Sequence, residues 1–126
     1  MTLILDSGSL IALEGNDRRM WRRLKSALIT SEIPVTHGGI VGQAWRGQGP
    51  RSALLAKALT GIDVRPLNEY LGKRAGELLA RAKKTDVIDA ALVLLASDGD
   101  VIATSDSGDI ERLARTAGRL VDLIAV

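Results

Sequence analysis

Apolar positions along the chain fall into two patterns, short continuous runs and longer stretches with a helical repeat. Continuous short runs predict buried strands. Apolar residues three and four positions apart predict amphipathic helices, which carry their polar residues on the other face. The expected strands are 2–5, 33–37, 62–67, 100–105 and 120–126, and the expected helices are 7–15, 17–29, 38–47, 51–60, 68–84, 86–97 and 109–118.

The order of these elements predicts an α/β fold. Strands that alternate with helices require crossover connections, and hence a mainly parallel sheet with helices on both faces. No linker, internal repeat or low-complexity tract interrupts residues 1–126, so we expect a single domain. In such sheets ligands bind beyond the carboxyl ends of the strands. Two of these ends carry an acid, Asp6 after the first run and Asp106 after the run 100–105.

The composition excludes several classes of site. Hydrophobic residues make up 46% and charged residues 25% of the 126 positions, as in ordinary globular domains. Cysteine is absent, which excludes disulfides and thiolate metal sites, and the single histidine, His37, excludes a zinc site of several imidazoles. We expect His37 at the surface or in a loop rather than as a ligand. Trp21, Trp45 and Tyr70 are the only aromatic residues, too few for a nucleic-acid platform of stacked rings.

Membrane and export signals are not apparent in the sequence. No stretch of about 18 uninterrupted apolar residues occurs, so we expect no membrane-spanning helix. The N-terminal segment MTLILDSGSL has no basic start and reaches Asp6 too early for a signal peptide. The expectation is a cytoplasmic protein that does not associate with a membrane.

Basic residues are concentrated locally, although the net charge is only +2. The segment 17–25, DRRMWRRLK, holds one group, and Lys83 and Lys84 form another. A basic rim around an acidic pocket would suit a polyanion held near a cation. The alternative for the first group is a solvated helix face.

Six aspartates lie in the otherwise apolar segment 85–110. Asp98 and Asp100 flank Gly99 and indicate an ordinary turn, so we exclude them from a site. Asp109 is expected to cap the helix that follows it. The segment therefore contains acids with structural roles beside those considered below.

Two further aspartates, Asp86 and Asp89, stand three positions apart at the start of an expected helix. This spacing places both side chains on one face. The positive end of the helix dipole can tolerate carboxylates there. For Asp86 the alternative is a simple helix cap, with Thr85 able to do the same. Asp89 is flanked by apolar residues and is harder to explain in this way.

Two strand ends and one helix start can bring Asp6, Asp89 and Asp106 around a single point. Each has a structural alternative, a cap for Asp6 and a strand-end turn for Asp106. Three bare carboxylates close together would raise one another's pKa, and a divalent cation removes this conflict. Oxygen ligands without histidine or cysteine favour Mg²⁺ or Mn²⁺ over zinc. Because Mg²⁺ commonly bridges to phosphate, the expected substrate is a phosphodiester or a phosphate.

The segments LILDSGSLIAL, DVIDAALVLLA and VIATSDSGDIERLA resemble the PIN-domain ribonucleases, most closely the VapC toxins of VapBC toxin–antitoxin pairs. The segment IVGQAWRGQGPRSALLAKAL resembles the middle of those toxins. The resemblance covers nearly the whole chain in the same order. It implies a three-layer α/β/α PIN fold and Mg²⁺- or Mn²⁺-dependent cleavage of RNA. It further implies a VapB-type antitoxin as partner and a homodimer.

By motif, the resemblance assigns the metal-binding and catalytic acids to Asp6, Asp89 and Asp106. Asp86 and Asp109 stand where many such toxins carry additional acids. Two residues of the strand 100–105 are expected to line the site and to hydrogen-bond an acid or a water. They are Thr104 and Ser105.

Gln43 departs from the family pattern, which commonly has glutamate at this position. Glutamine can accept a hydrogen bond through its carbonyl but carries no charge. Arg46, three residues on, is expected on nearly the same helical face and is a candidate phosphate contact, with a surface arginine as the alternative.

Two other functions compete with a nuclease. A non-catalytic module of the same fold, binding RNA or a partner, would explain Gln43. A phosphoacceptor signalling domain is disfavoured, because Asp6 has no paired acid and no lysine follows the strand 100–105. A nucleotide-binding sheet is also unfavoured, since GGIVGQ is not a G-x-G-x-x-G turn.

Overall fold

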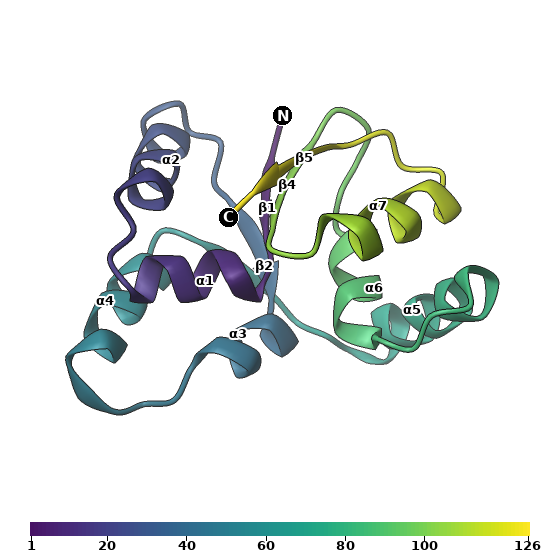
Figure 1. The fold of residues 1–126 in the computed structure, drawn as a ribbon, viewed down its shortest axis with the longest axis horizontal. Coiled ribbons are helices and arrows are strands. Elements are labelled where there is room, and N and C mark those ends of the chain that lie inside the picture. The colour runs from purple at the N-terminus through teal and green to yellow at the C-terminus, as the bar shows by residue number, and fades with distance from the viewer.

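The computed structural model describes residues 1–126 and contains one five-stranded sheet (Figure 1). All neighbouring strands are parallel, in the order β3-β2-β1-β4-β5. The prediction of an α/β fold with a parallel sheet is therefore confirmed, and the arrangement is that of a three-layer α/β/α PIN-like fold. The strands are β1 (Leu3–Leu5), β2 (Val35–His37), β3 (Asp63–Arg65), β4 (Val101–Thr104) and β5 (Asp122–Ala125).

Seven helices cover the sheet in two groups. The first four pack around α1 on one side, and the last three pack on one another on the other side (Figure 1). The first group is α1 (Ser7–Glu14), α2 (Arg18–Ile29), α3 (Gly38–Ala44) and α4 (Gly49–Leu59); the second is α5 (Glu69–Ala82), α6 (Val87–Leu94) and α7 (Ser107–Thr116).

The core is aliphatic, as the scarcity of aromatic residues requires. Its 26 buried hydrophobic residues form one cluster of Leu, Ile, Val, Ala and Met. All three residues of β1 and four consecutive residues of α6, Ala90–Val93, are buried. A helix buried on most of its surface explains why residues 86–97 are the most apolar of the expected helices. The central strand and α6 thus hold the two groups of helices together.

The starts of α5 and α7 decide two predictions about helix caps. Asn68 caps α5 as predicted, because its Oδ1 accepts the N–H of Leu71 at 3.0 Å. The prediction that Asp109 caps the last helix is wrong. That helix begins two residues earlier, at Ser107, so Asp106 occupies the cap position and Asp109 lies in the first turn.

His37 is fully buried, so the expectation of a surface or loop position is wrong. It ends β2 and caps α3, with Nδ1 accepting the N–H of Gly39 at 3.1 Å. The Nε2 atom lies 2.9 Å from the carbonyl oxygen of Ile88, to which it donates, since Nδ1 is the acceptor. Burial lowers the pKa of His37, while the bond to Ile88 opposes this change. The histidine therefore ties β2 to α6 as a neutral side chain.

None of the helices has the length and apolar character needed to cross a membrane, as predicted.

Candidate functional site

The crevice between β1 and β4 is the natural ligand position of this sheet. The chain proceeds from β1 to β2 and β3 on one side, whereas β4 and β5 lie on the other. A reversal of this kind opens a crevice beyond the carboxyl ends of the two central strands. Asp6 follows β1 and Asp106 lies two residues after β4, so both acids stand at this crevice. The topology therefore brings together two acids that are 100 positions apart.

Asp6 is held rigidly, with only 4% of its surface exposed. Its Oδ1 accepts the N–H of Ser9 at 2.9 Å and caps α1, as the structural alternative for this residue predicted. Its Oδ2 accepts the N–H of Ser105 at 3.0 Å, across the crevice. Hydrogen bonds to both oxygens offset the loss of hydration of the carboxylate. Asp6 therefore both caps a helix and joins the ends of β1 and β4.

Gly8 allows α1 to approach the β4 end closely. A Cβ atom at this position would lie 2.4 Å from Ser105 Oγ and 2.7 Å from Ser105 Cβ. Real atoms do not approach so closely, so any larger residue would push Ser105 away from Asp6. The sequence interpretation missed this role of the glycine, although a glycine within an expected helix is a signal of close packing.

Thr104 and Ser105 form hydrogen bonds at the end of β4, beside the acids. Thr104 is buried, and its Oγ1 accepts the N–H of Asp106 at 2.9 Å. Ser105 contributes its backbone N–H to Asp6, and its side chain is exposed. Asp106 itself is exposed and its carboxylate makes no capping bond, so its oxygens remain available to a ligand.

Asp86 caps α6, which confirms the structural alternative for this residue. Its Oδ1 accepts the N–H groups of Ile88 at 3.0 Å and Asp89 at 3.1 Å. Asp89 follows in the first turn of the helix, partly buried, and no N–H of the protein donates to its carboxylate. Asp89 therefore caps no helix, unlike Asp86.

The pKa of Asp89 is raised to about 7 from an ordinary value of 3.8. Burial is the largest cause, followed by the negative charges of Asp86, Asp106 and Asp6. Because all three act on Asp89, the four carboxyl groups share one neighbourhood. A strongly perturbed acid in a crevice is typical of functional sites.

Asp109 is paired with a lysine that the sequence suggested only as part of a basic rim. Lys84 Nζ lies 2.7 Å from Asp109 Oδ1. The hydrogen bond and the charge of Lys84 lower the pKa of Asp109. This acid is therefore neutralised locally and is less available to a cation than Asp89 or Asp106.

Gln43 and Arg46 do not share a helical face, so this expectation is wrong. α3 ends at Ala44, and Trp45 already has an extended backbone. Arg46 lies beyond the helix, where its Nη1 donates to the carbonyls of Gly42 at 3.3 Å and Trp45 at 2.9 Å. The guanidinium thus satisfies the free carbonyls at the end of α3. Gln43 is exposed on α3.

Asp98 and Asp100 have the structural roles expected of turn residues. Asp98 accepts the N–H of Leu120 at 2.8 Å. Asp100 accepts the N–H groups of Thr2 and Ser97, each at 2.8 Å. Their exclusion from the candidate site is consistent with these bonds. Those of Asp100 hold the starts of β1 and β4, at the edge of the sheet opposite the crevice.

The donor chemistry of the crevice suits a hard cation. The side-chain ligands available are carboxylate oxygens, which Mg²⁺ and Mn²⁺ prefer. The protein contains no group of three or more His, Cys, Asp or Glu side chains close enough together to bind one metal ion directly. Mg²⁺ commonly retains several waters and takes only one or two protein carboxylates. The acids therefore fit a hydrated ion better than one bound directly by three carboxylates.

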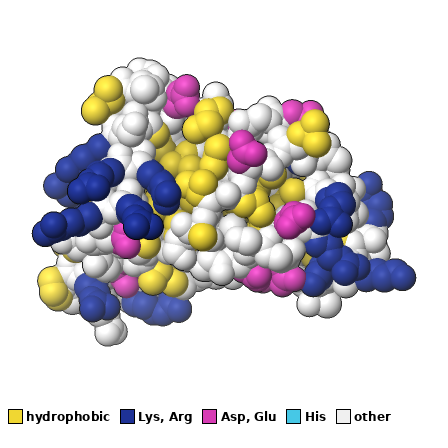
Figure 2. All heavy atoms as spheres, turned by 45° about the horizontal axis from the view of Figure 1, so that its top comes forward, with side chains coloured by type: hydrophobic (Ala, Val, Ile, Leu, Met, Phe, Trp, Pro, Cys, Tyr) yellow, Lys and Arg dark blue, Asp and Glu magenta, His cyan; other side chains and the backbone are white.

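Cationic side chains gather at two sides of the molecule, one group over α2 and another over α5 and α7 (Figure 2). The α2 group consists of the basic residues of the segment 17–25, all of which lie on the helix as predicted.

Comparison with protein-family models and with curated proteins finds no match to this chain.

Proposed function

We propose that this protein is a metal-dependent endoribonuclease, the toxin of a toxin–antitoxin pair of VapBC type. The observation that carries the proposal is the crevice between β1 and β4, where Asp6, Asp86 and Asp106 raise the pKa of Asp89. The motifs that resemble PIN-domain ribonucleases supply these same acids. The parallel sheet agrees with the fold that the resemblance implies.

The hydrogen bonds of the crevice suggest different roles for its acids. Asp89 and Asp106 have carboxylates that accept no N–H of the protein, so they are the residues that would hold a divalent ion, directly or through water. Asp6 would act with them from a fixed position, because both of its oxygens are hydrogen-bonded. Asp86 orients Asp89 by capping α6.

A bound Mg²⁺ or Mn²⁺ would lower the pKa of an attacking water and offset negative charge on the scissile phosphate. The Ser105 N–H holds Asp6 in place, and the Lys84–Asp109 pair keeps a cation at the rim of the crevice. The Lys and Arg side chains gathered over α2 would attract the RNA backbone.

The resemblance also supports the partners of the proposal. A small VapB-type antitoxin would cover the acidic crevice, and the toxin would act as a homodimer in the cytoplasm. The chain purified alone is the appropriate material for the test, because a bound antitoxin would conceal the activity.

Cleavage of total RNA by the antitoxin-free protein tests the proposal. We expect cleavage with Mg²⁺ or Mn²⁺, none with EDTA, and a loss of about a hundredfold or more in Asp89→Asn. Asp98→Asn is the matched control, because Asp98 is an acid outside the crevice. Cleavage that persists in EDTA, or in Asp89→Asn, would contradict the proposal.

A non-catalytic RNA-binding module is the second candidate, and the observation that favours it is Gln43, an exposed and uncharged residue on α3. Under this reading the natural protein binds RNA without cleaving it, and Gln43→Glu confers or strongly increases metal-dependent cleavage. A natural protein that already cleaves RNA, with no gain in Gln43→Glu, would remove this candidate.

A further inference from the structure

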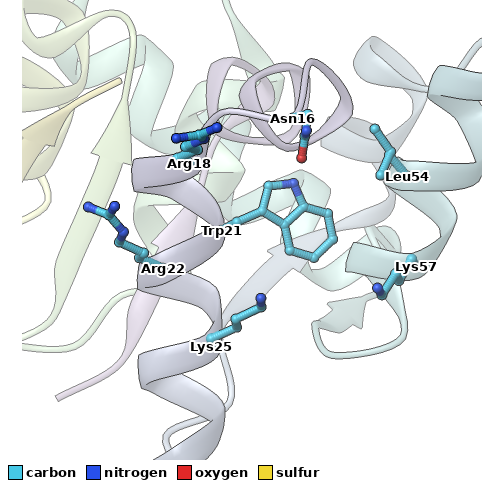
Figure 3. Close-up of a pocket in the computed structure, with 7 residues that line it drawn as sticks. All are labelled: Asn16, Arg18, Trp21, Arg22, Lys25, Leu54 and Lys57. Atoms are coloured by element: carbon cyan, nitrogen blue, oxygen red, sulfur yellow. The ribbon is translucent and has the colours of Figure 1, made fainter.

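A cavity of about 330 Å³ lies between α2 and α4, and none of the crevice aspartates lines it (Figure 3). The cavity opens beside Asn16, which lies after the end of α1. The crevice acid Asp6 lies before the start of the same helix, so the two sites are at opposite ends of α1. The seven residues that line the cavity are Asn16, Arg18, Trp21, Arg22, Lys25, Leu54 and Lys57. No acid is among them.

Trp21 is held in a fixed orientation at the centre of this cavity. Its indole Nε1 donates to the carbonyl oxygen of Leu13 at 3.0 Å. The ring is only partly buried and points into the space between α2 and α4 (Figure 3). The Lys57 ammonium lies 5.9 Å from the ring centroid, a cation–π distance. The ring is therefore oriented before any ligand arrives.

The four cations around Trp21 have no acidic partner. The ion pairs of the protein involve other residues, so Arg18, Arg22, Lys25 and Lys57 all lie more than 4 Å from any carboxylate oxygen. All four side chains are exposed. The cavity consequently combines an aromatic ring with a concentration of uncompensated positive charge.

The stability of helix α2 does not explain why these cations are present. Arg18 and Arg22 are four positions apart and Arg22 and Lys25 three apart, spacings at which like charges destabilise a helix. Arg18 also lies in the first turn, where the helix dipole disfavours a positive charge. Local rules of this kind are commonly broken at functional sites.

We propose that the cavity around Trp21 binds one nucleotide of a single-stranded RNA, with the base stacked on the indole and the flanking phosphates paired with the cations. Stacking on an aromatic ring beside a basic groove is the usual way in which proteins hold single strands without reading their sequence. An acidic peptide would use the cations but would leave the indole without a stacking partner. The choice of RNA rests on the proposed function.

The distance between the two sites sets the length of RNA that can reach both. Asp6 and Asn16 are separated by ten residues of mostly helical chain, which corresponds to about 15 Å. At about 3.4 Å per stacked nucleotide, a strand covers this distance in about four or five nucleotides. The Trp21 cavity would therefore position RNA at a distance from the cleaved bond.

Fluorescence of Trp21 tests the proposal directly. Trp45→Phe leaves Trp21 as the only tryptophan. In EDTA, which prevents metal-dependent cleavage, an oligouridylate of about 12 nucleotides is added, and in parallel a polyglutamate peptide of similar charge. We expect saturable quenching by the RNA, weakened by salt, and little quenching by the peptide.

Two double variants in the Trp45→Phe background separate this cavity from general attraction of RNA. Arg22→Ala with Lys25→Ala should weaken RNA binding about tenfold and lower the salt slope by about 1.4, since each phosphate contact contributes about 0.7. Arg74→Ala with Arg81→Ala removes the same charge from exposed positions of α5 and should change the quenching midpoint by about twofold at most.

The outcomes distinguish the proposal from its alternatives. RNA that binds without quenching Trp21, or equal losses in the two double variants, would overturn it. Quenching by polyglutamate at the same or lower concentration would overturn it in favour of an acidic protein partner. Because binding is measured without metal, a protein that fails to cleave RNA can still pass this test, so the two proposals fail separately.

Discussion

The backbone N–H of Ser105 donates a 3.0 Å hydrogen bond to Oδ2 of Asp6, and this bond joins the ends of β4 and β1 across 99 positions of sequence. The other oxygen of the same carboxylate caps α1 through the N–H of Ser9. One buried acid therefore fixes two strand ends and a helix start relative to one another.

Asp6→Asn should destabilise the fold as well as impair the proposed activity. Asparagine has one acceptor oxygen, so one of the two N–H groups now bonded to Asp6 loses its acceptor and faces an amide NH₂ instead. We expect the free energy of unfolding to fall by about 1–3 kcal/mol in urea titrations. Asp17→Asn is the control, because Asp17 accepts only the N–H of Met20 and asparagine caps equally well. Equal stability of the two variants would contradict the role given to Asp6.

Asp89→Asn should stabilise the metal-free protein at neutral pH. The folded protein holds the Asp89 proton up to about pH 7, whereas the unfolded chain releases it near pH 3.8. The contribution of this group to stability is therefore full below about pH 4 and declines as the pH rises to about 7. After allowance for screening of a half-buried group, we expect a gain of about 1–2 kcal/mol above pH 7 in Asp89→Asn.

Thermal unfolding in EDTA between pH 4 and pH 8 measures this effect. The difference between the natural protein and Asp89→Asn should grow with pH and level off above about pH 7. A difference that is constant across this range would show that the charge of Asp89 is not what destabilises the fold.

Gly8→Ala should destabilise the protein, although alanine is the better helix former by about 1 kcal/mol. The added Cβ would meet Ser105 Cβ at 2.7 Å. We expect a net loss of about 1–3 kcal/mol, because Ser105 must move and its bond to Asp6 weakens. Adding Ser105→Gly removes the obstructing side chain and keeps the N–H donor, so the double variant should recover most of the loss.

Gly76→Ala is the matched control for this prediction, since the glycine lies within α5 with nothing within 4 Å of the added Cβ. We expect it to stabilise the fold by about 0.5–1 kcal/mol. The close approach of α1 to β4 would be refuted if Gly8→Ala were as stabilising as Gly76→Ala.

His37 should produce a pH dependence opposite to that of Asp89. Its pKa is lowered in the folded protein, mainly by burial, so the unfolded chain binds the proton more strongly below about pH 6.5. Its stabilising contribution is full above pH 6.5 and declines as the pH falls. His37→Asn keeps a cap for Gly39 but loses the bond to the Ile88 carbonyl, so we expect a loss of about 1–2 kcal/mol at pH 7.5.

The Asp89→Asn background is the best one for this measurement, because it removes the opposing titration. In it, unfolding should become easier as the pH falls below 6.5, and the added His37→Asn change should abolish that trend. A trend that survives the loss of His37 would assign it to another group.

The sequence by itself determined the α/β class and the order of the elements. Continuous apolar runs and helical repeats follow from burial of a strand or of one helix face, and these periods are local properties of the chain. For the same reason the caps at Asn68 and Asp86 could be predicted. The boundary at Ser107 could not, because Asp106 and Asp109 are both good capping residues and only the packing of α7 selects between them.

Only the tertiary structure decided which side chains meet. The strand order β3-β2-β1-β4-β5 places the ends of β1 and β4 side by side, and the alternation of strands and helices does not specify that order. The burial of His37, the contact of Gly8 with Ser105 and the pairing of Lys84 with Asp109 depend on segments distant in sequence. Such contacts arise from the close packing of the whole chain, which no local pattern encodes.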